Sequence, residues 1–430
     1  MSEWTYAKLG EMLKVHHGFA FSGERMTDDL TGGPIVVSIG NFNYTGGFRF
    51  ESTRVREFRG EYPGEFELAP GDLLVVMTCQ TPGGEILGIP GIIPDDGKVY
   101  LHNQRIGRVE VIGDRLRKSF AYYLFLTSEV NRQLFSTASG TKILHTSPGR
   151  IEDVRCHIPP PREQDGIAAV LGALDDKIAV NGRIAAAADE LAGMQFRGHF
   201  SAALNHLIHG APLPPRWAAV AMGERTITVE TGTRPKGGVA QYLSGVPSIG
   251  AESIIGLGKF DFAKTKFIPD EFFSGMRRGV VEDRDILVYK DGGKPGDFRP
   301  HVTLFGNGFP FSKMCINEHV YRVRMTADIG QDFGYYWLTS APIMAEMRRR
   351  GTGAAIPGMN SSAFKGIPLV VPPSERISSF TAAAAPLVDR ALLAAVESRS
   401  LTALRDTLLP QLMSGSLRIK DAEKIVEDHV

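Results

Sequence analysis

The chain has 430 residues, of which 43% are hydrophobic and 22% are charged. This length and composition are those of a soluble globular protein with two or three domains, each large enough to bury its own core. The 48 basic and 48 acidic side chains cancel, so the net charge excludes attraction of nucleic acid by the molecule as a whole. Any such contact would have to come from a local patch of charge.

The three cysteines, Cys79, Cys156 and Cys315, lie far apart in the sequence and without CxxC spacing. An odd number at such spacing argues against a disulfide framework and against a structural zinc site, so we expect reduced thiols. The start of the chain lacks the basic and apolar segments of a signal peptide. No run of about 18 apolar residues occurs. We therefore expect a cytoplasmic protein with no membrane span.

Residues 1–160 have the pattern of a β-rich domain. Short runs of β-forming residues occur at 34–39, 72–77 and 105–112, and turns rich in glycine and proline separate them. The run IPPP at 158–161 then ends the pattern, because proline has no amide hydrogen to donate within a strand. The sequence predicts a first β-rich domain over 1–160.

A helical pattern follows over residues 161–210. Apolar or small side chains recur every three to four residues, which is the spacing of a coiled-coil seam. The seam positions are Ile167, Leu171, Leu174, Ile178, Asn181, Ala185, Ala188 and Leu191. A helix of about 40 residues would be about 60 Å long, far longer than a compact domain. It is expected to pack against a second long helix.

The second half of the chain repeats this order. β-like runs at 285–289 and 320–324 indicate a second β-rich domain over 211–372, and the proline break VPP at 371–373 precedes a second helical segment over 373–418. Pro386 would either kink this helix or lie near its start. Residues 419–430 are assigned as a C-terminal tail. The second seam consists of Phe380, Leu387, Ala391, Ala394, Leu401, Leu404, Leu408 and Leu412.

The two halves match one another at a nearly constant offset of 210–214 residues. Trp4 matches Trp217, GDLLV at 71–75 matches RDILV at 284–288, and NQRIGRV at 103–109 matches NEHVYRV at 317–323. Chance similarity between two domains would not keep such matches in order, so an internal duplication is favoured. The sequence predicts an α+β fold of two pseudo-repeated β-rich domains separated by two long antiparallel, coiled-coil-like helices.

Motifs for catalysis are missing from the sequence. The string VPPS at 371–374 has neither the Asn or Asp nor the aromatic residue of an adenine methyltransferase motif, and no GxxxxGK[ST] string for nucleotide binding exists. The pair His16–His17 has no partners at metal-ligand spacing, and Asp72 and Asp285 begin equivalent strands in separate domains. We expect no catalytic residue, no metal site and no cofactor in this chain.

Several strings resemble those of one known family. They are Trp4 with LGE at 9–11 and GFAF at 18–21, GDLLV at 71–75, HNQR at 102–105, IPPPREQ at 158–164 and LRDTLLPQLMSG at 404–415. In this order, and with the duplication, they resemble the specificity subunits of type I restriction–modification systems over about residues 3–418. The second half departs from the family pattern with Glu318-His319 and Glu375-Arg376, so the two repeats need not use these positions alike.

The resemblance implies a non-catalytic subunit. Residues 1–160 and 211–372 would be target recognition domains, each reading half of a split, asymmetric site on double-stranded DNA. The helices at 161–210 and 373–418 would set the spacer between the halves and dock two modification (methyltransferase) subunits. S-adenosylmethionine would be bound by those subunits. ATP would be used by restriction subunits that supply the motor and nuclease.

Candidate DNA contacts are polar and basic residues between the predicted strands, because base edges are read by hydrogen bonds and phosphates are held by cations. Residues 216–365 carry 20 basic and 15 acidic side chains, whereas residues 1–150 carry 16 and 17. In the first domain the candidates are Thr78, Gln80, Thr81, Arg105, Lys142 and His145. In the second they are Arg234, Lys236, Lys290, Lys294, Arg299, His301, Arg348, Arg349 and Arg350.

Two other functions stay open from the sequence. The neutral net charge fits a protein-interaction scaffold that does not read DNA, and salt-dependent DNA binding would separate the two hypotheses. A fused restriction–modification enzyme would need the catalytic motifs that this sequence lacks.

Overall fold

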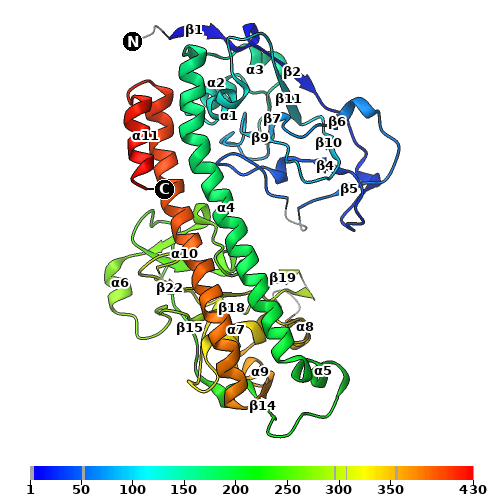
Figure 1. Ribbon diagram of the computed structural model, residues 1–430, viewed down its shortest axis with the longest axis vertical. Helices are drawn as coiled ribbons and strands as arrows, with labels where there is room; N and C mark the ends of the chain where they lie inside the picture. The colour runs from blue at the N-terminus through cyan, green and yellow to red at the C-terminus, as the bar shows by residue number, and fades with distance from the viewer. Residues whose placement is uncertain (1–3, 51–53, 295–296, 307, 354–356, 430) are drawn as a thin grey trace. The chain divides into compact units, whose positions relative to one another are not determined.

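The computed structural model describes residues 4–50, 54–294, 297–306, 308–353 and 357–429 (Figure 1). The chain divides into two compact units: unit 1 comprises residues 1–175 and 403–430, and unit 2 comprises residues 176–402. Both boundaries fall within long helices, so each unit contains a β-rich domain and a part of each long helix.

The main sheet of unit 1 is antiparallel, with strand order β2-β11-β7-β9. Every residue of its β7 strand is fully buried, which explains the continuous apolar run at this point of the sequence. A second sheet has the order β3-β5-β4-β10-β6, in which β4 and β10 are parallel. The strands of the main sheet are β2 (Leu13–His17), β11 (Ile106–Val111), β7 (Leu73–Val76) and β9 (Pro90–Ile92). Those of the second are β3 (Met26–Thr27), β5 (Glu57–Phe58), β4 (Ile35–Val37), β10 (Tyr100–His102) and β6 (Glu67–Leu68).

Two short strand pairs complete the β structure of unit 1. Strand β1 (Thr5–Lys8) pairs with β13 (Arg155–Ile158), and β8 (Thr78–Cys79) pairs with β12 (Leu144–His145). The first pair joins the start of the domain to the strand before the proline break, so the domain closes on itself before the long helix begins. The shorter helices of this unit are α1 (Lys118–Phe125), α2 (Ser128–Thr137), α3 (Pro148–Glu152) and α11 (Ile419–Glu427).

The main sheet of unit 2 has the same topology as that of unit 1, whereas its second sheet has the order β17-β16-β22. Its main sheet has the order β15-β23-β18-β21, β14 pairs with β24, and β16 and β22 are parallel as β4 and β10 are in unit 1. The strands of unit 2 are β14 (Ala218–Ala221), β15 (Thr226–Thr231), β16 (Val246–Ile249), β17 (Lys266–Ile268), β18 (Ile286–Tyr289), β19 (Gly293–Lys294), β20 (Asp297–Phe298), β21 (Val302–Leu304), β22 (Cys315–Ile316), β23 (Val320–Met325) and β24 (Pro368–Val371). The predicted α+β fold with two repeated β-rich domains is confirmed.

Unit 2 also contains shorter helices, which precede its strands or lie between them in the sequence. They are α5 (Ser201–His209), α6 (Asp270–Ser274), α7 (Gln331–Thr339), α8 (Ala341–Arg350) and α9 (Ser361–Lys365). Helix α7 supplies Phe333, Trp337 and Leu338, all fully buried, to the core of the unit. Residues 332–338 of this helix are all buried, so it is surrounded by the core on every side.

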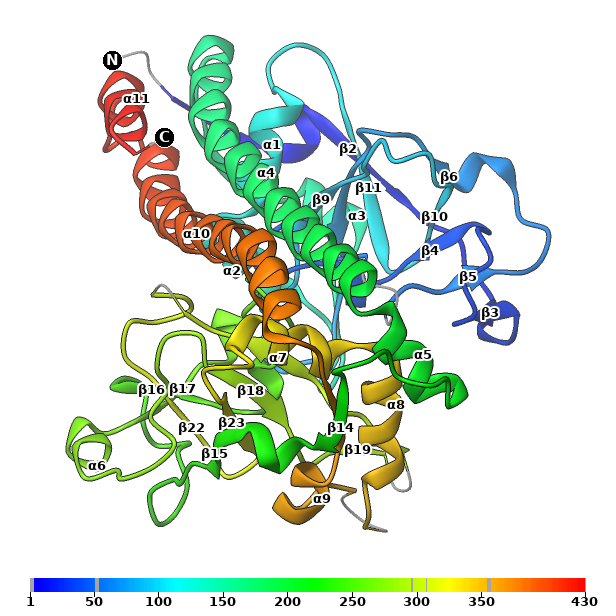
Figure 2. The same cartoon turned by 60° about the horizontal axis from the view of Figure 1, so that its bottom comes forward.

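The two long helices are α4 (Pro161–His199) and α10 (Ser374–Met413). Within unit 2 they run antiparallel, because Asn181 Nδ2 lies 2.9 Å from Glu397 Oε2 while the rings of Phe196 and Phe380 are 5.5 Å apart (Figure 2). Buried alanines on both helices allow a close approach. Helix α10 begins at Ser374 and continues through Pro386, so this proline does not mark the start of the helix.

Helix α10 also contains a window of 18 residues with a mean hydropathy of 1.3, and 39% of that window is buried. By length and composition alone it could cross a membrane, although core helices of soluble proteins pass the same test. Phe380, Val388 and Leu392 of this helix are fully buried in the core of unit 2. Core packing therefore accounts for its apolar composition, as in a soluble protein.

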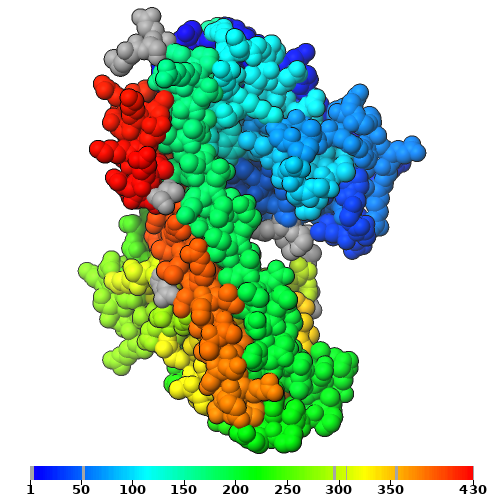
Figure 3. All heavy atoms as spheres, in the orientation of Figure 1, coloured from blue at the N-terminus to red at the C-terminus, as the bar shows by residue number. Residues whose placement is uncertain are grey.

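The segment after residue 418, assigned from the sequence as a tail, forms helix α11. Its Ile419 side chain lies against Gly166 at the start of α4, and the space-filling view shows α11 (red) beside that part of unit 1 (Figure 3). A side chain at position 166 would collide with Ile419, since an added Cβ would lie 2.8 Å from its Cδ1 atom.

Candidate nucleic-acid interface

The loops that carry most of the predicted contacts leave one end of the unit 2 sheet. Strand β15 ends at Thr231 opposite Tyr321, and β18 ends at Tyr289 opposite Val320, near the start of β23. Because neighbouring strands are antiparallel, the segments 232–245, 290–294, 297–301 and 317–319 extend from the same end. We call these segments the loop end of unit 2.

Acidic neighbours hold several of the predicted cations at this loop end. Arg234 Nε lies 2.7 Å from Glu318 Oε1, and Arg299 Nη2 lies 2.7 Å from Asp297 Oδ2. The Lys290 ammonium is paired with Asp291 and lies 5.6 Å from the centroid of the Tyr321 ring. With only 17% of its side chain exposed, Lys290 is placed to order the loop rather than to extend from it.

The charges of Arg299 and Arg348 act on His301, although α8 supplies Arg348 from far along the chain. The rings of His301 and Tyr289 are stacked with centroids 6.1 Å apart. Burial by surrounding atoms, followed by the positive charges of Arg348 and Arg299, lowers the pKa of His301 below its ordinary value. We call these three residues the basic cluster.

The predicted run of three arginines does not act as one unit. Arg349 and Arg350 both form ion pairs with Glu346, and Arg350 also donates to the carbonyl oxygen of Ala363. Arg348 is exposed and has no ion pair or hydrogen bond with any residue that the structure describes. It is the arginine of the run that is available to a partner. Lys236 is exposed in a turn, and the side chain of Lys294 lies outside the described residues.

The candidates of unit 1 occupy the equivalent end of its sheet, where β2 ends at His17 and β11 begins at Ile106. The hydroxyl of Thr78 lies 3.0 Å from His145 Nδ1. Thr78 is buried and His145 is exposed, so only His145 is accessible to a partner. The hydroxyl of Thr81 donates to Glu85. The remaining candidates, Gln80, Arg105 and Lys142, are exposed.

The two loop ends present different chemistry on the same backbone. His145 faces Thr78 across the short ladder of unit 1, and the corresponding ladder of unit 2 places Gly358 opposite Asp291. An added Cβ at Gly358 would lie 2.4 Å from Asp291 Oδ1. One repeat thus offers an imidazole where the other has no side chain.

Sequence reasoning missed the acidic partners at the loop end of unit 2. Asp291 accepts from Lys290 and lies 3.2 Å from His319 Nδ1, and Glu318 holds Arg234. The adjacency of Lys290 and Asp291 in the sequence was the available signal for the first pair. The Arg234–Glu318 pair joins loops 84 residues apart, and no local sequence pattern predicts it.

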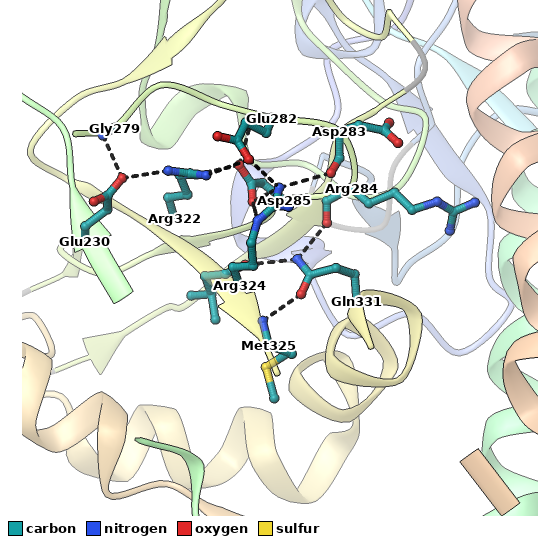
Figure 4. A network of polar contacts seen from close by, with 11 residues as sticks. Glu230, Gly279, Glu282, Asp283, Arg284, Asp285, Arg322, Arg324, Met325 and Gln331 are labelled. Atoms are coloured by element: carbon teal, nitrogen blue, oxygen red, sulfur yellow. Dashed lines mark hydrogen bonds and ion pairs between the residues drawn. The ribbon is translucent and has the colours of Figure 1, made fainter. Parts of the chain in front are cut away.

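The opposite end of the unit 2 sheet holds a buried charge network, which we call the Asp285 network (Figure 4). Asp285 is fully buried and pairs with both Arg322 and Arg324, while Arg322 also contacts Glu230 and Glu282. Asp285 accepts a hydrogen bond from the Glu282 amide as well, and so closes the turn before β18. The network joins strands β15 and β23 to the turn before β18.

Arg284 precedes this network and fixes it to neighbouring helices. Its guanidinium pairs with Asp332 of α7 and Asp389 of α10. Its φ angle of 60° is a left-handed conformation that costs free energy for a residue with a side chain. The matching residue of unit 1 is Gly71, with φ 83°, so both units have the same turn. Glycine adopts this conformation without strain, whereas Arg284 is strained but forms two ion pairs.

Within the described residues, no group of three or more His, Cys, Asp or Glu side chains is arranged to hold a metal ion. The three cysteines are buried free thiols. Burial raises the pKa of Cys156 to about 12, so this thiol is protonated and unreactive at neutral pH.

Comparisons with known proteins bear on both units. Residues 1–188 match the family of the type I restriction modification DNA specificity domain. The MjaIX specificity subunit of a type I restriction enzyme from Methanocaldococcus jannaschii is 20% identical over 366 residues, covering 81% of this chain and 78% of that protein. The MjaVIII specificity subunit of the same organism is 22% identical over 180 residues, 41% of each chain.

A crystal structure of a type I restriction–modification S subunit from M. genitalium has the same fold, with a TM-score of 0.54 at 15% identity, and the match covers 96% of both chains. The shared architecture is two repeated β-rich domains, with unlike loop ends in this chain, joined to two long helices. The chain is therefore similar to specificity subunits of type I restriction–modification systems, by a family match over residues 1–188 and by likeness to a specificity subunit over most of its length.

Proposed function

We propose that the loop end of each unit reads one half of a bipartite, asymmetric DNA target, and that α4 and α10 set the spacer and dock two modification subunits. The observation that carries this proposal is the repeated sheet, which presents its loops at the same end in both units but with different side chains. Different side chains would select different bases, so the two halves of the target should differ in sequence.

Within each loop end, the exposed polar side chains divide by chemistry. Gln80, Arg105 and His145 of unit 1 can donate or accept hydrogen bonds at base edges. In unit 2 the Glu318 carboxylate holds Arg234 in a fixed orientation, as a base-reading guanidinium requires. The basic cluster suits phosphate contacts, since Arg348 is exposed and without a partner among the residues that the structure describes.

The chain would work as a non-catalytic subunit in the cytoplasm. Its sequence has no adenine methyltransferase motif and no nucleotide-binding GxxxxGK[ST] string, which supports a role in recognition alone. S-adenosylmethionine and ATP would then be bound by partner subunits, the first by the modification subunits and the second by restriction subunits.

Replacing Arg348 by alanine is expected to weaken binding to target and scrambled duplexes alike and to reduce the slope of log K against log salt by about 1, because one phosphate contact is lost. Fluorescence anisotropy of the complex with modification subunits, measured over a salt series, reports both quantities. The matched control is Arg349→Ala, since Arg349 is adjacent and exposed but paired with Glu346. Equal effects of the two substitutions, or none for Arg348→Ala, would contradict the assignment.

Lengthening both helices should lengthen the unread spacer of the target. Four extra residues add about 6 Å to a helix, which corresponds to about two base pairs at 3.4 Å each. The insertions belong at facing positions, beside Asn181 in α4 and beside Glu397 in α10, because these two side chains contact each other. Mapping methylated adenines in DNA from cells with the whole system gives the spacer. An unchanged spacer in an active complex would show that the helices do not measure it.

A further inference from the structure

Unit 1 contains a pocket of about 660 Å³ where the end of α10 meets α2 and the strand pair β1–β13. Its lining includes Trp4, Leu124, Glu129, His157, Leu409 and Met413. A volume of this size lies within the range of about 300–1,000 Å³ found for ligand sites. All of the lining residues belong to unit 1.

The internal repeat shows what fills the matching space in unit 2. At an offset of 213 residues, Trp4 corresponds to Trp217, Leu124 to Trp337, Leu409 to Phe196 and Met413 to Phe200. The ring centroids of Phe196 and Trp337 are 6.4 Å apart, and those of Phe200 and Trp217 are 6.3 Å apart. Aromatic rings of the chain itself therefore occupy this space in unit 2.

Burial differs between the two copies as the side chains do. Phe196 and Phe200 are 1% and 0% exposed, whereas their counterparts Leu409 and Met413 are only half-buried. Unit 1 has smaller aliphatic side chains where unit 2 has aromatic ones, and Trp4 lines the resulting space. The pocket thus has the shape for aromatic rings that unit 1 does not supply.

The rim of the pocket also carries a hydrogen-bond acceptor that unit 2 lacks. Glu129 is exposed at the pocket, and its carboxylate has no hydrogen bond or ion pair with the described part of the chain. The matching residue of unit 2 is Pro342, which offers no such acceptor. A ring that carries an N–H or O–H donor would satisfy both the apolar walls and this carboxylate.

We propose that this pocket receives a tryptophan or tyrosine side chain of a modification subunit. The choice of partner rests on the proposed function, in which the long helices dock modification subunits, and the end of α10 forms one wall of the pocket. The ring would pack between Trp4 and the aliphatic pair Leu409 and Met413, and its donor would bond to Glu129. A buried aromatic anchor of this kind commonly dominates an interface.

The test fills the pocket in the way that unit 2 does. In the full chain, Leu409→Phe with Met413→Phe should weaken binding of the purified modification subunit about tenfold or more in calorimetric titrations, the effect of losing a buried anchor. Its melting temperature should not fall. Thr407→Phe, at an exposed position of the same helix that does not line the pocket, should bind as the wild type does.

Two further measurements keep the result decisive if the double variant folds poorly. Glu129→Gln, a surface change, should weaken binding severalfold. A benzophenone crosslinker in place of Ser414, on the pocket lining, should attach to a modification-subunit peptide that contains tryptophan or tyrosine. Attachment to a second copy of this chain, or wild-type affinity in the filled variant, would overturn the inference and leave the proposed function intact. A wild-type chain that fails to bind the modification subunit would instead overturn the proposed function.

Discussion

Replacement of Asp285 by asparagine is expected to lower the free energy of unfolding of unit 2 by about 3–5 kcal/mol. Asp285 is fully buried and is the carboxylate shared by Arg322 and Arg324, whose side chains are 11% and 30% exposed. Removing its charge leaves two guanidinium groups with one fewer partner in a place that water reaches poorly. Breaking a buried ion pair by removing one partner lowers the free energy of unfolding by about 3–5 kcal/mol. Urea unfolding of the full chain measures the change.

The repeat provides a matched control in Asp72→Asn. Asp72 occupies the same turn of unit 1 and accepts a hydrogen bond from the Ala69 amide, as Asp285 does from Glu282, but no arginine pairs with it among the described residues. Because asparagine can still accept that bond, a loss of about 1 kcal/mol or less is expected. Similar losses for the two substitutions would show that the turn, and not the Asp285 network, provides the stability.

The second large effect concerns pH. His102 is 3% exposed and its Nε2 lies 2.7 Å from the carbonyl oxygen of Ile106. Burial lowers the pKa of His102 to about 4 from an ordinary value of 6.5. The unfolded chain therefore binds a proton near pH 6.5 that the folded chain takes up only near pH 4, so stability falls as the pH decreases through this window. The loss should reach about 3 kcal/mol at pH 4.

His102→Gln separates this contribution from those of other groups. Glutamine keeps a hydrogen-bond donor but does not titrate between pH 4 and 7, so the variant should lose less stability than the wild type as the pH falls. Free energies of unfolding from urea titrations at intervals of half a pH unit give the two curves. Parallel curves would mean that the pKa of His102 is the same in the folded and the unfolded chain. At the matching position unit 2 has Ile316, fully buried, so this sensitivity is expected for unit 1 alone.

The two repeats also differ at matching positions of a turn and of the core. The turn that begins the central strand carries Gly71 in one unit and Arg284 in the other, both with positive φ angles. Arg284 uses its strained position to reach Asp332 and Asp389. Similarly, Phe196 and Phe200 fill a space in the core of unit 2, and the matching space in unit 1 is an open pocket, which we propose for a partner side chain.

From the sequence alone, the duplication, the positions of five strands and the presence of two long helices could be predicted, although α4 ends at His199 and not at residue 210. Apolar periodicity and proline breaks are local properties of the chain, and matching strings at a constant offset need no structure to be seen. The family followed from the order of those strings. The C-terminal helix α11 was missed, since its few apolar residues, such as Ala422 and Val426, give a short pattern.

The tertiary structure decided which of the predicted contacts remain available to DNA. Three adjacent arginines look alike in the sequence, but Arg349 and Arg350 share Glu346 while Arg348 is exposed without a partner in the described part of the chain. Thr78 is buried under His145, 67 residues away. The pocket of unit 1 likewise depends on side chains from both ends of the chain. Burial and pairing depend on neighbours that are distant in sequence, and only the folded chain brings them together.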